Sequence, residues 1–266
     1  MTSSHPIVVQ PPIARQQETE NTIHGHRLVD QYAWLREKTS PEVITFLEQE
    51  NAYTNAIMKP TEELQAKLYA EMVSHIKESD VSVPFRDKDY FYYSRTEQAA
   101  QYPIYCRKHG SLAAAEEIIL DMNQMAAGEG FLALGALTVS DDGSLLAYST
   151  DTTGFRQYTL HIKDLTTGEV LADQAQRVGS VVWAAGNHTL FYTVEDEATK
   201  RQFQLFRHTL GTPQAADALV YEEGDERFNV GAGRTRDGKY ILLEAPATPP
   251  ARNSFCPPMI RRDAGL

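Results

Sequence analysis

A unit of about 50 residues recurs from residue 83 onward, and this repeat constrains the fold more than any other feature. Short β-prone runs begin at residues 90, 145, 189 and 240, so successive units are offset by 55, 44 and 51 residues. Each run follows a turn signal, and these are Arg86-Asp87-Lys88, Asp141-Asp142-Gly143, Ala185-Gly186-Asn187 and Arg236-Asp237-Gly238. A self-similar unit of this length, built of several short strands, is typical of a β-propeller blade.

Further strand candidates lie between these runs, at residues 102–108, 157–165 and 202–209. A β-sandwich with turns every 8–12 residues is the alternative. The repeated order of turn, aromatic strand, polar gap, strand and glycine turn favours the propeller. Residues 77–245 provide about three to three and a half blades, whereas propellers close with 4–8 blades. The sequence therefore predicts a mainly β chain with a partial propeller, whose open edge offers a surface for self-association.

Residues 1–76 are predicted to be irregular at first and then helical. Prolines interrupt the first residues, and Ser40-Pro41-Glu42 has the pattern of a helix start. That helix is expected to stop at Pro60, and Thr61 is expected to cap a second helix. Leu64, Leu68, Met72 and Ile76 then recur at steps of four residues and form one apolar stripe. Two such helices imply a larger body to pack against.

The last stretch, residues 246–266, is predicted to be disordered. It contains five of the 13 prolines and shows no strand alternation. It begins directly after the first predicted strand of the fourth repeat, so the repeat is interrupted there.

The charge balance excludes some classes of partner. Acidic residues outnumber basic ones 36 to 25, giving a net charge of −11, which argues against binding to nucleic acid or to an anionic membrane. No run of 18 apolar residues and no signal peptide occur, so no membrane association is expected. The two cysteines, Cys106 and Cys256, are far apart and favour a reduced, cytoplasmic setting.

No catalytic apparatus is recognisable in the sequence. No serine has the Gly-x-Ser-x-Gly context of a nucleophile elbow, and neither His-Glu-x-x-His nor Cys-x-x-Cys occurs. His24-Gly25-His26 is interpreted as a turn, and Asp141-Asp142-Gly143 lacks the ligand pattern of a calcium loop. The acidic residues 221–226 are interpreted as a solvated loop. The remaining histidines are scattered and are expected to be structural or exposed: His75, His109, His161, His188 and His208. The sequence thus predicts no catalytic residue, metal ligand or cofactor, and it assigns no substrate-binding residue.

Several segments resemble a known family. His24-Gly25 followed by residues 30–36, Asp-Gln-Tyr-Ala-Trp-Leu-Arg, resembles the N-terminal signature of the prolyl oligopeptidase family. Further segments are similar to its oligopeptidase B branch, namely residues 50–54, 68–72, 101–105, 156–158, 207–212 and 221–223. The resemblance spans about residues 6–244.

The resemblance implies a cytosolic serine peptidase in which a seven-bladed propeller caps an α/β-hydrolase domain and the N-terminal helices pack on that domain. In the family, the catalytic serine, aspartate and histidine, and the acidic residues that select lysine or arginine, lie in the hydrolase part. No position of this sequence matches them, so no catalytic role is carried over. The propeller's role, limiting access to short peptides, is carried over.

Together these observations predict the N-terminal part of an oligopeptidase-B-like protein, truncated by a premature stop, a frameshift or a split gene. Such a chain is expected to be inactive alone and to meet short basic peptides only within a full-length enzyme. The alternative is a stand-alone interaction or regulatory module that oligomerises or pairs with a separate hydrolase subunit.

Overall fold

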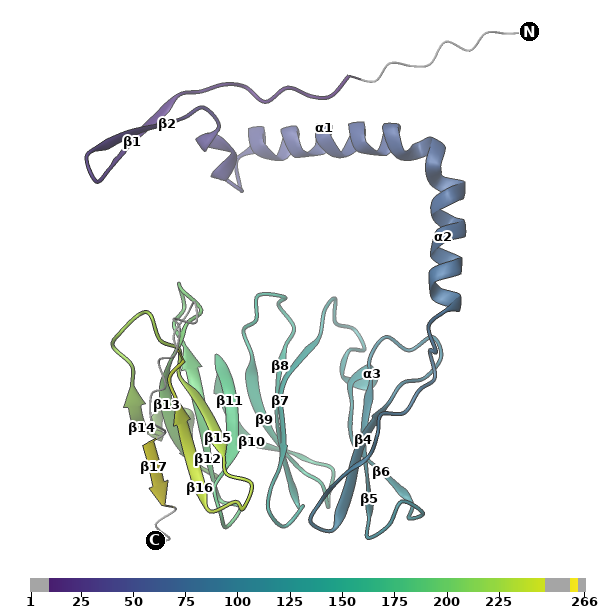
Figure 1. The fold of residues 1–266 in the computed structure, drawn as a ribbon, viewed down its shortest axis with the longest axis vertical. Coiled ribbons are helices and arrows are strands. Elements are labelled where there is room, and N and C mark those ends of the chain that lie inside the picture. The colour runs from purple at the N-terminus through teal and green to yellow at the C-terminus, as the bar shows by residue number, and fades with distance from the viewer. Residues whose placement is uncertain (1–9, 247–258, 263–266) are drawn as a thin grey trace. The chain divides into compact units, whose positions relative to one another are not determined.

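The structure, a computed structural model, describes residues 10–246 and the backbone of residues 259–262 (Figure 1). The chain divides into two compact units, residues 1–77 and residues 78–266. The sequence prediction placed this boundary between residues 76 and 77. Among the described residues, no helix is both long and apolar enough to cross a membrane.

The N-terminal unit starts with a β-hairpin that the sequence did not predict. Strands β1 (Thr19–Ile23) and β2 (His26–Asp30) pair in antiparallel fashion and are exposed along almost their whole length. His24 and Gly25 form the two-residue turn between them, with φ angles of 52° and 79°. Two consecutive residues of positive φ are what the favoured two-residue hairpin turn requires. The prediction of a turn at this histidine pair is therefore confirmed.

The hairpin is followed by the predicted helices. The 3₁₀ turn η1 (Ala33–Arg36) leads to α1 (Pro41–Met58), and η2 (Lys59–Thr61) leads to α2 (Glu62–Ser74). Ser40 and Thr61 occupy the expected cap positions, but neither side chain caps the helix that follows. The second helix ends at Ser74, so Ile76 lies beyond it.

The second unit consists of antiparallel sheets in which each strand pairs with its neighbours along the chain. Blade 1 holds β3 (Phe85–Asp87), β4 (Tyr90–Arg95), β5 (Ile104–His109) and β6 (Glu116–Asp121). Blade 2 holds β7 (Ala133–Val139), β8 (Leu145–Asp151), β9 (Thr159–Asp164) and β10 (Val170–Gln176). Blade 3 holds β11 (Val178–Trp183), β12 (Thr189–Glu195), β13 (Gln202–Thr209) and β14 (Ala218–Glu222). Two short helical segments, α3 (Met122–Met125) and η3 (Gln214–Ala216), join strands. The predicted partial propeller is confirmed.

The fourth sheet contains β15 (Gly231–Arg234), β16 (Tyr240–Glu244) and β17 (Met259–Arg262). Strand β17 pairs with β16, with Tyr240 opposite Arg262. The prediction of disorder over residues 246–266 is therefore wrong for these four residues, because the exposed edge of β16 offers hydrogen-bonding groups to a following segment. The rest of that prediction, for residues 247–258 and 263–266, lies outside the described residues.

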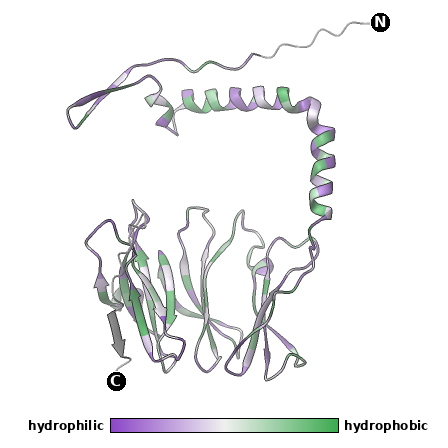
Figure 2. Ribbon diagram, in the orientation of Figure 1, coloured by the Kyte–Doolittle hydropathy of each residue, from purple (hydrophilic) through white to green (hydrophobic). Residues whose placement is uncertain are grey.

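Apolar side chains lie between neighbouring blades, where they form two separate cores. Between blades 2 and 3 the fully buried residues include Leu160, Ile162, Trp183, Leu190 and Tyr192. Between blades 1 and 2 the buried residues are Ile119, Leu120, Met122, Leu132, Leu146 and Tyr148. Figure 2 shows these hydrophobic stretches along the strands of the propeller. The first strands of blade 2, blade 3 and the fourth sheet are neighbours, because β11 contacts both β7 and β15.

The first strands of blades 2 and 3 share a bulge built around a glycine. In β7 the register shifts between Leu134 and Leu137, and the Ala136 N–H donates to Ser149 Oγ over 2.8 Å. In β11 the shift lies between Val178 and Val181, and the Ser180 N–H donates to Thr193 Oγ1 over 2.9 Å. The glycines of these bulges, Gly135 and Gly179, are offset by the same 44 residues as the repeat itself. A hydroxyl on the second strand thus satisfies the N–H that each bulge frees from the ladder.

Candidate functional site

Asp141 connects the turns at one end of the four sheets. Its carboxylate receives two hydrogen bonds from the Arg234 guanidinium, Nη1 to Oδ1 over 2.7 Å and Nη2 to Oδ2 over 2.8 Å. The Lys88 ammonium also pairs with it. The Asp141 backbone N–H donates to Asn187 Oδ1 over 2.8 Å. We call Lys88, Asp141, Asn187 and Arg234 the turn cluster; the first three belong to blades 1, 2 and 3, and Arg234 belongs to the fourth sheet.

The turn cluster fixes the protonation state of its carboxyl group. Hydrogen bonds from Arg234, together with those from Lys88, lower the pKa of Asp141 from 3.8 to about 2, although partial burial opposes the shift. A two-pronged arginine–carboxylate pair also restricts orientation more than a single contact does. The cluster can therefore hold the turns of the four sheets at fixed distances from one another.

Arg107 provides a second link between blades 1 and 2. Its guanidinium carbon lies 4.1 Å from the Tyr90 ring centroid, its Nε donates to Glu117 over 2.8 Å, and its Nη1 donates to the Gly143 carbonyl. The side chain is almost fully buried, and Glu117 balances its charge. Arg107, a buried cation stacked on Tyr90, thus connects blade 1 to the turn of blade 2.

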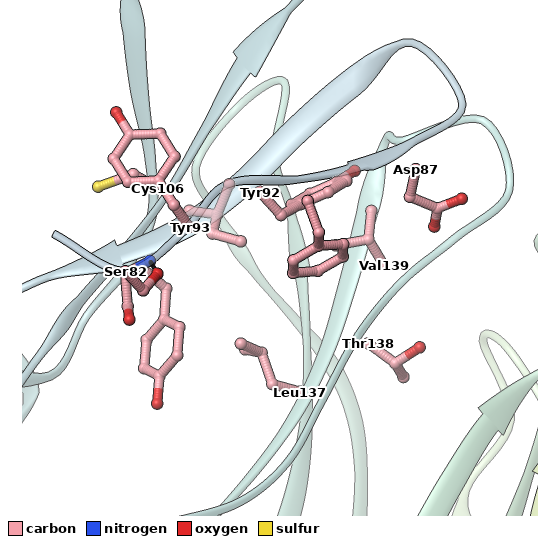
Figure 3. A pocket seen from close by; sticks show the side chains of 12 residues that line it. Ser82, Asp87, Tyr92, Tyr93, Cys106, Leu137, Thr138 and Val139 are labelled. Carbon is pink, nitrogen blue, oxygen red and sulfur yellow. Dashed lines mark hydrogen bonds between the residues drawn. The ribbon is translucent and has the colours of Figure 1, made fainter. Parts of the chain in front are cut away.

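A pocket of about 320 Å³ lies next to the turn cluster, between blades 1 and 2. Figure 3 shows Tyr92 and Asp87 on one side of it and Leu137, Thr138 and Val139 across from them. The pocket is lined mainly by apolar and aromatic groups, with a few polar atoms, as small-molecule sites usually are. It is a candidate ligand site at the interface of these two blades.

Burial affects the protonation of two side chains that line the pocket. Burial raises the pKa of the Tyr92 hydroxyl, which Arg107 partly offsets. Burial also raises the pKa of the Cys106 thiol to about 11, so the thiolate that would be needed for nucleophilic attack is scarcely present at neutral pH. Both side chains are therefore mostly protonated at neutral pH.

A histidine–carboxylate network lies buried in blade 3, at a residue that the sequence indicated only as structural or exposed. His208 Nδ1 lies 2.7 Å from Asp217 Oδ1, and its Nε2 lies 3.1 Å from Asp173 Oδ1. The Tyr192 hydroxyl donates to the other oxygen of Asp217 over 2.6 Å. Because carboxylates contact both ring nitrogens, neither nitrogen is available to accept a proton from a serine. The network joins β10 of blade 2 to blade 3 and is structural.

The residues of the N-terminal signature also have structural contacts. Trp34 Nε1 donates to the Arg15 carbonyl over 2.8 Å, and the Arg15 guanidinium both stacks on the Trp34 ring and pairs with Glu42. Asp30 accepts from the Tyr32 N–H over 2.8 Å and from Arg36 over 3.0 Å. These contacts hold the segment after the hairpin against the start of α1. The signature residues Asp30, Tyr32, Trp34 and Arg36 therefore have structural contacts.

The structure brings few of the singled-out residues together. His24 and His26 lie in the hairpin, and Asp141 to Gly143 form a turn whose first residue joins the turn cluster. No group of three or more histidine, cysteine, aspartate or glutamate side chains suited to a metal ion occurs within the described part of the chain. Cys106 is a free, buried thiol, and Cys256 lies outside the described residues.

Comparison with protein families matches residues 11–264 to the model described as "Prolyl oligopeptidase, N-terminal beta-propeller domain". Among curated proteins, the chain is 39% identical over 256 residues to Dipeptidyl aminopeptidase BI of Pseudoxanthomonas mexicana, covering 90% of this chain and 35% of that protein. It is 37% identical over 240 residues to Protease 2 of Moraxella lacunata, covering 87% of this chain and 35% of that protein.

Solved structures of oligopeptidase B are also similar to this chain. Oligopeptidase B from Leishmania major superposes with a TM-score of 0.80 at 30% identity, covering 89% of this chain and 36% of that one. Oligopeptidase B from Trypanosoma brucei superposes with a TM-score of 0.80 at 31% identity, covering 88% and 35%. The chain thus spans about a third of the length of these relatives.

Proposed function

The chain belongs to the prolyl oligopeptidase family, and from this premise we propose that it forms the first blades of a substrate-gating propeller of an oligopeptidase-B-like serine peptidase. In this proposal, the peptidase cleaves short peptides after lysine or arginine in the cytoplasm. This chain supplies access control, and the catalytic serine, aspartate and histidine come from the hydrolase part.

The observation that carries the proposal is the combination of a match over residues 11–264 with coverage of about a third of the relatives. His208 lies between two carboxylates, with both ring nitrogens in contact with Asp173 and Asp217. A general base in acyl transfer needs one of these nitrogens for the nucleophile.

Access control by the propeller is supported by contacts that link one blade to the next. The turn cluster joins all four sheets, and Arg107 joins blades 1 and 2. Such links keep neighbouring blades from separating at the end where these turns lie, which a filter for peptide size requires.

Two measurements test this proposal. The purified 266-residue chain, incubated with a fluorogenic Arg-Arg substrate, is expected to show no hydrolysis that a serine-directed organophosphate inhibits. Inhibitor-sensitive turnover by the chain alone would refute the proposal that the catalytic residues come from the hydrolase part.

The second measurement uses a chimera in which this chain replaces the matching third of Moraxella lacunata Protease 2. The ratio of short-peptide to casein cleavage is compared with that of the unmodified protease. A retained preference for the short peptide is expected. A chimera that digests casein as readily as the peptide would contradict the gating role.

A stand-alone interaction or regulatory module is the second candidate, and the exposed apolar side chains beside β3 are the observation in its favour. Size-exclusion chromatography with light scattering separates the two candidates. A single, soluble oligomer of defined mass would favour the module, whereas a heterogeneous distribution favours a propeller segment that functions within a larger peptidase.

A further inference from the structure

The pocket between blades 1 and 2 has a wall of aromatic rings that ends in a carboxylate. Strand alternation places Phe85 and Asp87 on the same face of β3, with Tyr92 opposite Phe85 on β4. The Phe85 and Tyr92 rings are stacked, with centroids 5.7 Å apart. Figure 3 shows the Asp87 carboxylate at the end of the pocket next to Tyr92.

Asp87 differs from the other acidic groups near this pocket. Asp141 is paired with Arg234 and Lys88, and Glu117 is paired with Arg107. The side chain of Asp87, in contrast, makes no hydrogen bond or ion pair with any group in the described part of the chain. Its carboxylate is exposed and lines the pocket, so it is available to a ligand.

An aromatic wall that ends in a free carboxylate has the chemistry to recognise an arginine side chain. A guanidinium stacks on aromatic faces and pairs with a carboxylate, while its methylene stem suits the apolar side formed by Leu137 and Val139. The same face of blade 1 already contains one such contact, because Arg107 stacks on Tyr90 at 4.1 Å. The volume of about 320 Å³ lies at the lower end of the range for small-ligand sites.

We propose that this pocket is a subsite for one arginine side chain of a peptide, held between the Phe85–Tyr92 wall and Leu137 and paired with Asp87. The proposal rests on the proposed function only in taking a peptide as the source of the arginine. Because the subsite lies in the propeller, it engages a residue of the peptide away from any bond that is cleaved. A peptide bearing an arginine would thus be retained at the propeller before it reaches the hydrolase part.

The test is a titration of the 266-residue chain with N-acetyl-arginine-amide, followed by amide shifts in NMR spectra at a protein concentration below the onset of association measured by light scattering. Shifts at Leu137, Thr138 and Val139 are expected, and N-acetyl-citrulline-amide, which has nearly the same shape without the charge, is expected to produce much weaker ones. The Asp87→Asn variant is expected to weaken arginine-probe binding about fivefold, since it removes the paired charge. Phe85→Ala is expected to weaken it by a similar factor.

Asp89→Asn is the matched control, because Asp89 is an exposed acid two residues further along the same turn and does not line the pocket. It should leave the affinity within a factor of about 1.5 of the original. Equal binding of the citrulline probe, shifts confined to other regions, an absence of shifts, or equal losses in D87N and D89N would each overturn the proposal. These outcomes concern binding to this chain alone, so they are independent of the peptidase tests above.

Discussion

At the scale of single residues, Asp141 contributes to stability through contacts that depend on its charge. It receives hydrogen bonds from side chains of two other blades, and its own N–H reaches a third. Replacing it leaves the Arg234 guanidinium partly buried without its partner carboxylate. Leaving one charge partly buried without its partner lowers the free energy of unfolding by more than the ion pair itself contributes. Replacing Asp141 alone is therefore expected to give a measurable loss of stability.

The Asp141→Asn variant is expected to lower the free energy of unfolding by about 1–2 kcal/mol at pH 7. Because the pKa of Asp141 in the folded chain is lowered from 3.8 to about 2, its contribution is fully present above about pH 5 and is lost as the pH falls towards 2. Urea unfolding at a series of pH values measures this difference. The gap between the original chain and D141N should narrow towards pH 2, whereas Asp89→Asn should show little gap at any pH. A gap that stays constant from pH 7 to pH 2 would contradict the assignment.

At the scale of elements, the glycine bulge in β7 determines how closely the first two strands of blade 2 approach each other. A Cβ added at Gly135 would lie 2.6 Å from Ser149 Oγ and 2.8 Å from the Tyr158 ring. We expect Gly135→Ala to lower the free energy of unfolding by about 1–3 kcal/mol, because Ser149 Oγ cannot move away without losing the hydrogen bond that it accepts from the Ala136 N–H. Chemical denaturation measures the loss. At Gly130 an added Cβ meets no atom within 4 Å, so a comparable loss in Gly130→Ala would remove this explanation.

Elements with a local pattern could be predicted from the sequence, and those that depend on distant partners could not. The run 202–209 coincides with β13, because its alternating residues and the glycine turn after it are adjacent in the sequence. The β1–β2 hairpin was missed because its strands are exposed and lack an apolar alternation. At the candidate site, Asp141 was indicated only as a turn residue, since its partner Arg234 lies 93 residues away. His208 was missed as a network centre for the same reason, since Asp173 lies 35 residues from it.

At the scale of the whole molecule, the first strand of blade 1 leaves apolar side chains in water. Val83, beside β3, is 89% exposed, and Phe85 is 62% exposed. Within the described residues strand β3 pairs only with β4, so its other edge also carries backbone groups that no strand of this part of the chain pairs. The 266-residue chain studied alone is therefore expected to associate as its concentration rises.

Light scattering over a range of protein concentrations measures this association. Val83→Lys is expected to shift the onset to at least threefold higher concentration, because a charge at the edge opposes strand and apolar pairing. Thr166→Lys adds the same charge at an exposed turn of blade 2 and should change the onset much less. Equal shifts in the two variants would show that net charge, and not the β3 edge, controls association.

The order of strands within each sheet has a consequence for how the chain reaches its structure. In every blade, each strand pairs with the strand before or after it along the chain. In blades 1 to 3 short loops join these partners, so the entropy lost in closing each loop is small and contacts of low sequence separation dominate. A blade has all of its own strands as soon as its last strand leaves the ribosome, because it borrows none from later segments. Folding can then advance blade by blade during synthesis, with long-range pairs such as Asp141–Arg234 forming last.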